Sequence, residues 1–309
     1  MRPKIYLSRA VPSDCLARLE AIGELTWSPN REGPPAHGEL LEQLPGHDVA
    51  VIQLTEDLDA RVLNAAAPRL KLVSQVAVGV DNIDLEVCRL LGVQVAHTPG
   101  VLTDATADLT MALLLAACRR VVEADRFVRE GQWKLWSLDL MCGMELRGRT
   151  LGILGRGRIG SAVARRAEAF GMQVIHCSRR SGVTLDELLL RADILSLHAP
   201  LTPDTEKIID EKALFGMKEG AVLINTSRGG LVEEAALAPA LDNGPLRAVG
   251  LDVYEGEPSV HPSLLGRSDV VLLPHIGSAT ERTRHRMAEL AVEAVESWVR
   301  GERIAHSAL

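Results

Sequence analysis

Three polar residues in the last third of the chain each follow an apolar run typical of a buried strand. Arg228 follows AVLIN, Glu257 follows AVGLDV, and His275 follows VVLLP. In an open α/β sheet, the carboxyl ends of such strands form the edge where ligands bind. A guanidinium can hold a small acid, an imidazole can protonate its carbonyl oxygen, and a carboxylate can tune the imidazole. Together the three residues predict a site that reduces the carbonyl of a small acid.

A glycine-rich segment lies upstream of this set, between an expected strand (TLGILG) and an expected helix (SAVARRAEAFG). Its spacing is GxGxxG, which in that context indicates a dinucleotide-binding turn. The glycines permit a tight turn, and the helix amino terminus offers free N–H groups to phosphates. The alternative is a glycine-rich turn that only packs a helix against a strand. The expected cofactor-binding residues of this turn are Gly155, Arg156, Gly157, Arg158, Ile159 and Gly160.

The strand after this turn indicates which dinucleotide is bound. An NAD site usually has an acidic residue at its end for the ribose 2′-OH, whereas arginine accommodates a 2′-phosphate. Here the strand MQVIHC ends in Ser178, Arg179 and Arg180, with no acid. A hydroxyl and two guanidinium groups favour a phosphate. The sequence therefore predicts NADP(H) as the preferred cofactor, with NAD(H) possible. The alternative is that the two arginines only form a solvated strand end and bind no phosphate.

Strands and helices alternate along most of the chain, which indicates parallel sheets with crossover helices. In the first hundred residues the expected strands are KIYLS, DVAVIQ, LKLVSQVAV and VQVAHT, and the expected helices cover 12–23, 59–67 and 84–91. One long helix is expected over 104–130, followed by an irregular stretch with Trp133 and Trp136. A second alternating unit begins at Thr150, and a last helix covers 281–300. The one loose linker candidate is Asn30–Gly38.

Composition excludes several classes of protein. The chain has 309 residues, 47% of them hydrophobic, which is enough for two domains with buried cores. A net charge of −7 without a basic block argues against nucleic-acid binding. The longest apolar stretch, Met111–Cys118, is too short to span a membrane. Five widely separated cysteines predict a reduced, cytoplasmic protein without a bound metal.

Six segments together resemble the D-isomer-specific 2-hydroxyacid dehydrogenase family over nearly the whole chain, most closely its glyoxylate/hydroxypyruvate reductase branch. They are AVGVDNID, HTPGVLTDATADL, LGILGRGRIG, NTSRGG, GLDVYEGEP and PHIGSAT. The resemblance implies an α/β fold of two doubly wound parallel-sheet domains. A Rossmann cofactor domain (100–280) would be inserted into a flavodoxin-like substrate, or catalytic, domain (1–99 plus 281–309).

The resemblance also implies residue roles. Arg228 would hold the substrate's carboxylate and carbonyl oxygen, His275 would give that oxygen a proton, and Glu257 would bond the imidazole and favour its charged form. Glu257 is chosen over Glu255 because it directly precedes proline. Backbone amides of Val78 and Gly79 would grip the carboxylate. Asp252 would bind the nicotinamide carboxamide, and further cofactor contacts would come from Thr106, Thr226, Ser227 and Gly277.

Alternatives remain for each of these roles. Arg228 could bind a cofactor phosphate, Glu257 could be a solvated loop acid, and an isolated histidine is more often structural than catalytic. His97, His176 and His198 also end strands without an Arg–Glu set, and are expected to line the cofactor or the surface.

The resemblance narrows the substrate to a small 2-keto or 2-hydroxy acid, with glyoxylate and hydroxypyruvate favoured. D-lactate-type or broader 2-keto acid dehydrogenases are the runner-up. Val78 stands where phosphite dehydrogenases have a lysine, and Leu273 stands where formate dehydrogenases have a glutamine. These two differences argue against both of those classes of enzyme. A non-enzymatic corepressor that senses the dinucleotide is a further alternative. A homodimer is expected, with an arm around Trp133 and Trp136 and with Trp136 as the candidate to reach the partner's active site; plain packing is the alternative there.

Overall fold

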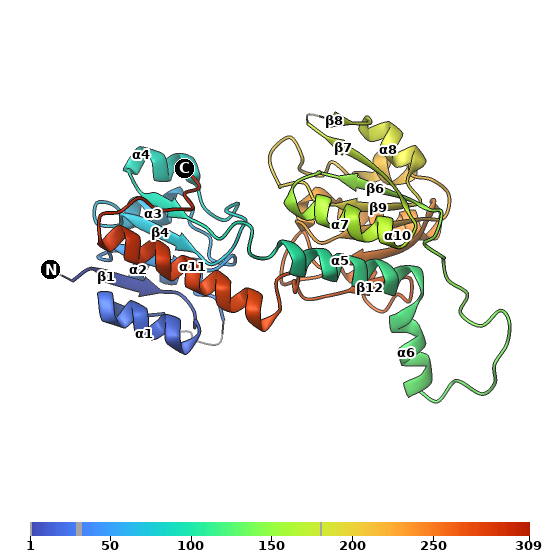
Figure 1. The fold of residues 1–309 in the computed structure, drawn as a ribbon, viewed down its shortest axis with the longest axis horizontal. Coiled ribbons are helices and arrows are strands. Elements are labelled where there is room, and N and C mark those ends of the chain that lie inside the picture. Colours follow the sequence, from blue (N-terminus) through green and yellow to red (C-terminus); the bar gives the residue numbers. More distant parts are fainter. Residues whose placement is uncertain (1, 29–32, 180) are drawn as a thin grey trace. The chain divides into compact units, whose positions relative to one another are not determined.

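The computed structural model describes residues 2–28, 33–179 and 181–309. Of the linker candidate Asn30–Gly38, the first three residues therefore lie outside the described residues. The chain divides into two compact units, one made of Met1–Leu102 and Ala279–Leu309 and the other of Thr103–Ser278 (Figure 1). Each unit has its own sheet and its own hydrophobic cores.

The sheet of the first unit has the strand order β2-β1-β3-β4-β5, with every neighbouring pair parallel. The strands are β1 (Lys4–Leu7), β2 (Glu24–Trp27), β3 (Val49–Ile52), β4 (Leu72–Gln75) and β5 (Gln94–Ala96). Strand β2 is not among the strands expected from the sequence, because this short edge strand is only half-buried and has no apolar run. The order places a topological switch point between β1 and β3.

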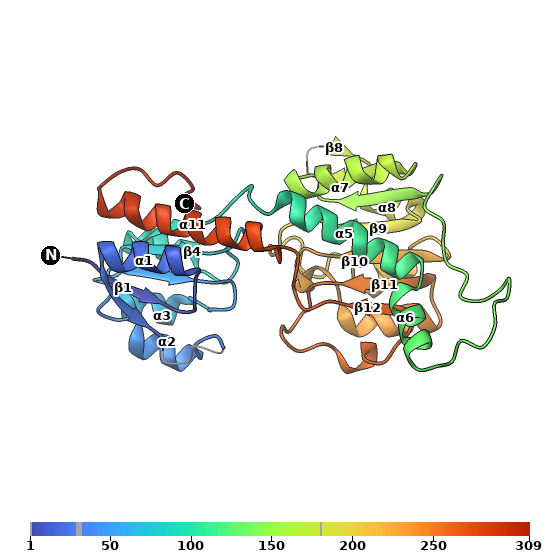
Figure 2. The same ribbon diagram turned by 60° about the horizontal axis from the view of Figure 1, so that its bottom comes forward.

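Helices cover both faces of this sheet, as the doubly wound fold requires (Figure 2). On one face pack α1 (Ser13–Ile22) and α11 (Glu281–Val299), through residues such as Leu19 and Val292. On the other face pack α2 (His37–Gln43), α3 (Ala60–Ala66) and α4 (Leu85–Leu91). Helices α3 and α4 are capped at their amino ends by Asp59 and Asp84, whose carboxylates accept the N–H groups of Val62 and Val87.

The second unit has the strand order β12-β11-β10-β9-β6-β7-β8. Its strands are β6 (Thr150–Leu154), β7 (Gln173–Ser178), β8 (Ser181–Gly182), β9 (Ile194–Leu197), β10 (Ala221–Asn225), β11 (Leu246–Leu251) and β12 (Val270–Leu272). All neighbouring pairs are parallel except β7 with β8, which is antiparallel. Strands β9 and β10 are buried along their whole length, which explains their continuous apolar sequences.

Helices cover both faces of this sheet as well. Helices α5 (Thr103–Cys118) and α7 (Arg158–Ala169) pack on one face. On the other face pack α8 (Leu185–Arg191), α9 (Glu211–Phe215) and α10 (Leu237–Asp242). Short 3₁₀ turns η1 (Gly229–Leu231), η2 (Glu234–Ala236) and η3 (Pro262–Leu264) lie in the connections. The predicted α/β class with two parallel sheets is therefore confirmed.

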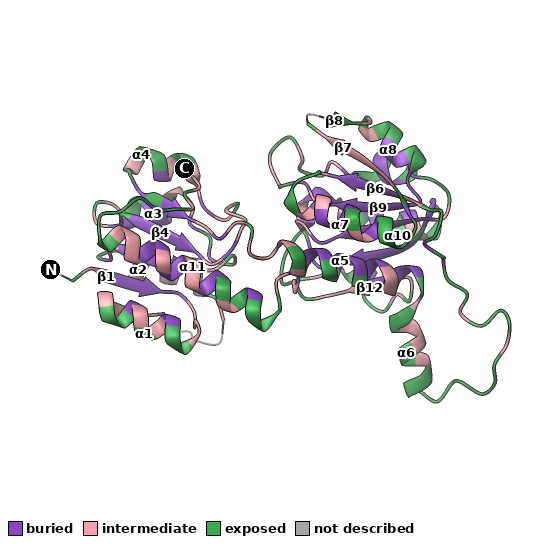
Figure 3. Ribbon diagram, in the orientation of Figure 1, coloured by how far each residue is buried: buried purple, intermediate pink, exposed green. Residues whose placement is uncertain are grey.

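The single long helix predicted over 104–130 is wrong. Helix α5 ends at Cys118, and α6 (Val121–Arg129) begins after Arg120, whose φ of 55° interrupts the helical path. A later segment of the chain accounts for the end of α5, because the N–H of Met144 donates to the carbonyl of Cys118 (2.7 Å). Helix α6 leaves the core, and none of its nine residues is buried (Figure 3). Residues 131–146 follow as an irregular segment.

Candidate active site and dinucleotide turn

The three predicted catalytic residues follow three adjacent strands of the second unit. Arg228 lies three residues after β10, Glu257 lies six after β11, and His275 lies three after β12. These strands are parallel neighbours, with Asn225 opposite Leu251 and Leu251 opposite Leu272. The loops that carry the three side chains therefore leave the same edge of the sheet.

His275 and Glu257 form a hydrogen-bonded pair. The Nδ1 atom of His275 lies 2.7 Å from Oε2 of Glu257, and both side chains are about one quarter exposed. An ionised carboxylate only accepts hydrogen bonds, so Nδ1 carries the proton of this bond. Nε2 is then the ring nitrogen left to face a ligand. This is the arrangement of a proton donor oriented by a carboxylate.

The backbone of His275 has a left-handed conformation, with φ of 52°. Such a conformation is uncommon for a residue with a side chain and is costly unless its surroundings hold it in place. Asp252 holds the next two residues: one carboxylate oxygen accepts the N–H of Ile276 (2.7 Å) and the other accepts that of Gly277 (2.8 Å). Asp252 is 1% exposed, and burial raises the pKa of its carboxyl group. Asp252 thus fixes the turn that presents His275.

Arg228 is presented by a turn built around a buried asparagine. The side chain of Asn225 accepts the N–H of Ser227 (3.0 Å) and donates to the carbonyl of Arg228 (2.8 Å). The hydroxyl of Ser227 donates to the carbonyl of Ala199 at 2.6 Å. Asn225 was not among the residues predicted for the site, although it lies in the quoted NTSRGG motif. Its role is to shape the loop that carries Arg228.

Tyr254 connects the three loops that carry the predicted catalytic residues. Its N–H donates to Oε1 of Glu257 (3.0 Å), and its hydroxyl donates to the carbonyl of Leu273 (2.7 Å), two residues before His275. Its backbone also packs directly against Gly229, where an added Cβ would lie 1.8 Å from the Tyr254 carbonyl carbon. Burial raises the pKa of Tyr254 to about 12, so the phenol stays a hydrogen-bond donor. Tyr254 was not among the predicted site residues, because an aromatic residue next to a strand is usually only part of the core.

A row of threonines lies beside the Asp252 turn. The hydroxyl of Thr106 donates to the carbonyl of Gly277 (3.1 Å), and the hydroxyls of Thr110 and Thr226 lie 2.8 Å apart. The predicted cofactor contacts Thr106, Thr226, Asp252 and Gly277 are therefore brought together in one buried network. Thr110, whose hydroxyl also donates to the carbonyl of Thr106, was not predicted.

The glycine-rich turn lies between β6 and α7, as predicted from its flanks. Gly155 has φ of 95°, and an added Cβ would lie 2.6 Å from backbone atoms of residues 198 and 199. At Gly157 an added Cβ would meet nothing within 4 Å, which leaves room for a ligand. The first backbone bond of α7 runs from Ser161 to Gly157, so the preceding N–H groups are available to a diphosphate. These features fit a dinucleotide.

The end of β7 lies next to this turn, since β6 and β7 are paired. Ser178 closes β7, and its hydroxyl donates to the carbonyl of Ser181 (2.9 Å). The guanidinium of Arg179 is exposed and lies 3.3 Å from the carboxylate of Asp204. Arg180, the third predicted residue here, lies outside the described residues.

Val78 and Gly79 lie in the first unit, in the loop after β4. The carbonyl of Val78 accepts from Nδ1 of His97 (2.9 Å), and that of Gly79 accepts from Nε2 of Gln75 (3.1 Å). The carbonyl groups are thus held by the protein itself. Their contact with a substrate carboxylate remains a prediction.

His198, another strand-end histidine, is half-buried. Burial lowers its pKa to about 4, so its imidazole is neutral at physiological pH. Its Nε2 lies 2.9 Å from the hydroxyl of Ser196, and its Nδ1 has no hydrogen-bond partner among the described residues. The backbone of His198 lies against Gly155, so this residue supports the glycine turn.

The described residues contain no helix that is both long and apolar enough to cross a membrane. Together, the doubly wound second unit and its glycine-rich turn define a dinucleotide-binding α/β protein. Residues 111–277 match the family model described as D-isomer specific 2-hydroxyacid dehydrogenase, NAD binding domain.

Known proteins agree with this class over nearly the whole chain. A glyoxylate reductase of Korarchaeum cryptofilum is 46% identical, covering 98% of this chain and 94% of the relative. The crystal structure of the TT0316 protein from Thermus thermophilus has a TM-score of 0.92 and 43% identity, covering 99% of this chain and 100% of that one. An NADPH-dependent glyoxylate/hydroxypyruvate reductase of Sinorhizobium meliloti, solved with NADP and malonate, has a TM-score of 0.88 and 32% identity, covering 99% and 97%. The chain belongs to the D-isomer specific 2-hydroxyacid dehydrogenase family and is an oxidoreductase that uses a nicotinamide dinucleotide.

Proposed function

We propose that this enzyme reduces glyoxylate or hydroxypyruvate to the corresponding 2-hydroxy acid with NADPH. The observation that carries the proposal is the His275–Glu257 pair, whose side chains are 2.7 Å apart in the loops after β12 and β11, in the same sheet as strand β6, which leads into the dinucleotide turn. A bound reduced nicotinamide supplies the hydride for the carbonyl carbon. His275 donates a proton from Nε2 to the carbonyl oxygen, and Glu257 stabilises the charged imidazole. Arg228 holds the substrate's carboxylate and carbonyl oxygen through its planar guanidinium.

The choice of substrate rests on the relatives. The Korarchaeum protein is named a glyoxylate reductase, and the Sinorhizobium protein a glyoxylate/hydroxypyruvate reductase. The deciding assay measures kcat/KM of the purified enzyme with glyoxylate, hydroxypyruvate, pyruvate and longer 2-keto acids. Higher kcat/KM with pyruvate or a longer acid would favour the D-lactate-type alternative. Tight dinucleotide binding without turnover of any 2-keto acid would support the corepressor alternative.

The choice of NADPH rests on the end of β7. Ser178 and Arg179 stand where an NAD-specific enzyme usually has an acid, and the Sinorhizobium relative is NADPH-dependent. Arg179 lies in an exposed ion pair with Asp204, but it can leave that pair to bind a phosphate, because exposed ion pairs contribute at most about 1 kcal/mol. The assay compares kcat/KM with NADPH and NADH at one substrate concentration. A higher value with NADH would overturn this part of the proposal.

Substitution of His275 tests the mechanism. His275→Gln removes the proton donor while keeping a polar side chain, so we expect kcat for 2-keto acid reduction to fall about 10²- to 10⁴-fold. Dinucleotide affinity, measured by quenching of protein fluorescence, should stay within a factor of about three, since the variant keeps the glycine turn. Loss of dinucleotide binding would instead assign His275 to the cofactor site.

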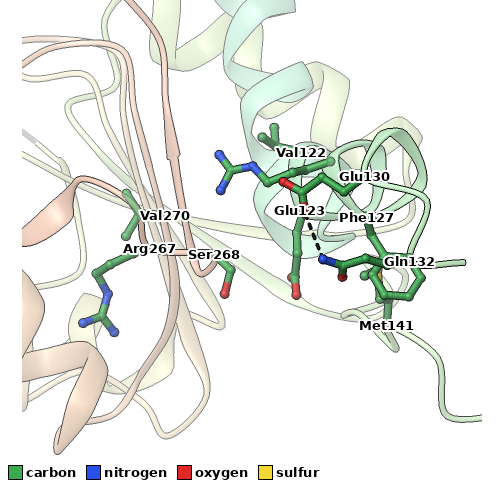
Figure 4. A pocket seen from close by; sticks show the side chains of 10 residues that line it. Val122, Glu123, Phe127, Glu130, Gln132, Met141, Arg267, Ser268 and Val270 are labelled. Carbon is green, nitrogen blue, oxygen red and sulfur yellow. Dashed lines mark hydrogen bonds between the residues drawn. The ribbon is translucent and has the colours of Figure 1, made fainter.

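We also propose a homodimer formed through α6 and the segment 131–143. This segment exposes Trp133, Leu135, Trp136 and Leu138, the last two with 71% and 86% of their surface accessible. Beside it, between α6 and the chain entering β12, lies a pocket of about 140 Å³ (Figure 4). Its lining combines the apolar Val122, Phe127, Met141 and Val270 with six charged or polar residues, Glu123, Arg126, Glu130, Gln132, Arg267 and Ser268. Exposed apolar surface of this extent usually marks an interface. A second copy of the chain is the proposed occupant.

Three further assignments remain predictions. The first unit would hold the substrate and the second the dinucleotide, with Val78 and Gly79 contributing backbone amides. Trp136 would reach the partner's active site. A cytoplasmic location rests on the widely spaced cysteines alone.

A further inference from the structure

A polar cluster joins the glycine-rich turn to the end of β7. Its members are Arg156, between the first two glycines of the turn, His176 and Ser178 on β7, and Ser181 on β8. Nη1 of Arg156 lies 3.2 Å from Nδ1 of His176, and Nε2 of His176 lies 3.1 Å from the hydroxyl of Ser181. The hydroxyls of Ser178 and Ser181 are 3.2 Å apart.

The chemistry of the groups fixes the direction of these hydrogen bonds. A guanidinium only donates, so Nδ1 of His176 is the acceptor and carries no proton. Burial and the neighbouring charge of Arg156 lower the pKa of His176, so its ring is neutral at physiological pH. The ring proton therefore lies on Nε2 and is donated to Ser181. His176 thus holds one N–H of Arg156, while the other guanidinium N–H groups remain available to an anion.

The position of the cluster matches one part of a dinucleotide. The turn after the first strand of such a fold carries the diphosphate, and the end of the second strand carries the adenosine ribose. Arg156 reaches from the first of these positions to the second. Its side chain is solvent-accessible, as is that of Ser181, and no described carboxylate bonds to any of the four residues. An accessible cation with hydroxyl groups and without a paired acid suits a phosphate monoester.

We propose that Arg156 is the specificity-determining residue for the 2′-phosphate of NADP(H), with His176 as its positioning residue and the hydroxyls of Ser178 and Ser181 as further phosphate ligands. The inference rests on the proposed NADPH-dependent function and deepens it. It places the main phosphate contact at the glycine-rich turn, with Ser178 at the end of β7 as a further ligand.

The test compares Arg156→Leu with the wild-type enzyme using NADPH and NADH in parallel. Loss of a charge-assisted phosphate contact should lower kcat/KM for NADPH about 10- to 100-fold, while the value for NADH changes less than about threefold. Arg165→Leu is the matched control, because Arg165 is an exposed arginine of α7 with no hydrogen bond or ion pair to another described residue. Binding of 2′,5′-ADP and 5′-AMP, measured by calorimetry, should show the same selective loss.

An equal fall of kcat/KM with both cofactors would assign Arg156 to the diphosphate that NADPH and NADH share, and it would overturn the inference. An unchanged ratio of kcat/KM for NADPH to that for NADH would overturn it as well. Wild-type preference for NADH would overturn the proposed cofactor choice, yet the ratio of Arg156→Leu to wild type would still report on the 2′-phosphate contact.

Two variants of His176 test positioning. His176→Ala should lower the NADPH/NADH ratio about 3- to 10-fold, the net contribution of one hydrogen bond. His176→Asn should restore it, because the asparagine oxygen can replace Nδ1 as the acceptor for Arg156. A purely structural role would lower kcat/KM with both cofactors alike, and failure of His176→Asn to restore the ratio would reject the positioning role.

Discussion

At the scale of single residues, the candidate site depends on contacts that admit no extra atoms. Gly229 follows Arg228 directly and packs against the carbonyl group of Tyr254, so that the loops after β10 and β11 touch. A methyl group added there would lie within 2.4 Å of three backbone atoms. The backbone would have to move, and Arg228 would move with it. The absence of a side chain at position 229 is therefore part of how Arg228 is aimed.

Gly229→Ala should reduce activity through the substrate. We expect KM for the 2-keto acid to rise at least about tenfold, since overpacking of this kind costs about 1–3 kcal/mol. KM for NADPH should change less, because the glycine turn is untouched. Gly256→Ala is the matched control in the neighbouring turn, where an added Cβ meets nothing within 4 Å. Steady-state kinetics of both variants would show the difference; an unchanged KM for Gly229→Ala would contradict the packing argument.

At the scale of elements, the amino ends of three strands of the second unit are tied together by Asp193. Its carboxylate accepts the N–H of Thr150 at the start of β6 (2.8 Å) and the ammonium of Lys218 (2.8 Å). Its carbonyl accepts the N–H of Val222 in β10. The side chain is only 9% exposed. Burial alone would raise the pKa of Asp193, but the bonds from Lys218 and Thr150 outweigh it and hold that pKa below its usual 3.8.

This network predicts a pH-dependent contribution to stability. A lowered pKa means that the folded state favours the ionised form, so the stabilisation is fully present above pH 3.8 and is lost as the pH falls below 3.8 and through the lower pKa of the folded state. Asp193→Asn should lower the free energy of unfolding by about 1–3 kcal/mol at pH 7 and by clearly less at pH 3. Urea unfolding followed by circular dichroism measures both values. Glu219→Gln, an exposed change beside Lys218, is the control; a difference from wild type that is independent of pH would argue against the ion pair.

At the scale of the whole molecule, the exposed apolar segment has an expected consequence for assembly. The wild-type enzyme should have a mass near twice the 33.4 kDa of one chain when measured by light scattering after gel filtration. The double variant Leu135→Glu/Leu138→Glu places charges in an interface, so it should shift the mass towards one chain. Leu90→Glu is the control, because Leu90 is 84% exposed on α4, outside the proposed interface. A wild-type monomer, or a double variant that stays dimeric, would refute the assignment of this segment.

Much of the fold follows from local sequence. Buried parallel strands need continuous apolar runs, so AVLIN and its neighbours could be recognised without a structure, and the glycine spacing could be placed between a strand and a helix. The misses have physical causes. Strand β2 has no apolar run because it is a half-buried edge, and α5 ends at Cys118 because a segment 26 residues later donates to its carbonyl. Interactions of that range leave no periodic signal in the helix itself.

The sequence alone determined which chemical groups stand at strand ends: Arg228, Glu257 and His275 on one set of strands, and the glycine turn with Ser178 and Arg179 on another. Only the tertiary structure decided which groups touch. It showed that Tyr254 joins three loops, that Asp252 clamps the turn after His275, and that Arg156 reaches His176. The physical reason is that contacts between residues far apart in the chain depend on strand order and side-chain direction, and neither is encoded at any one position.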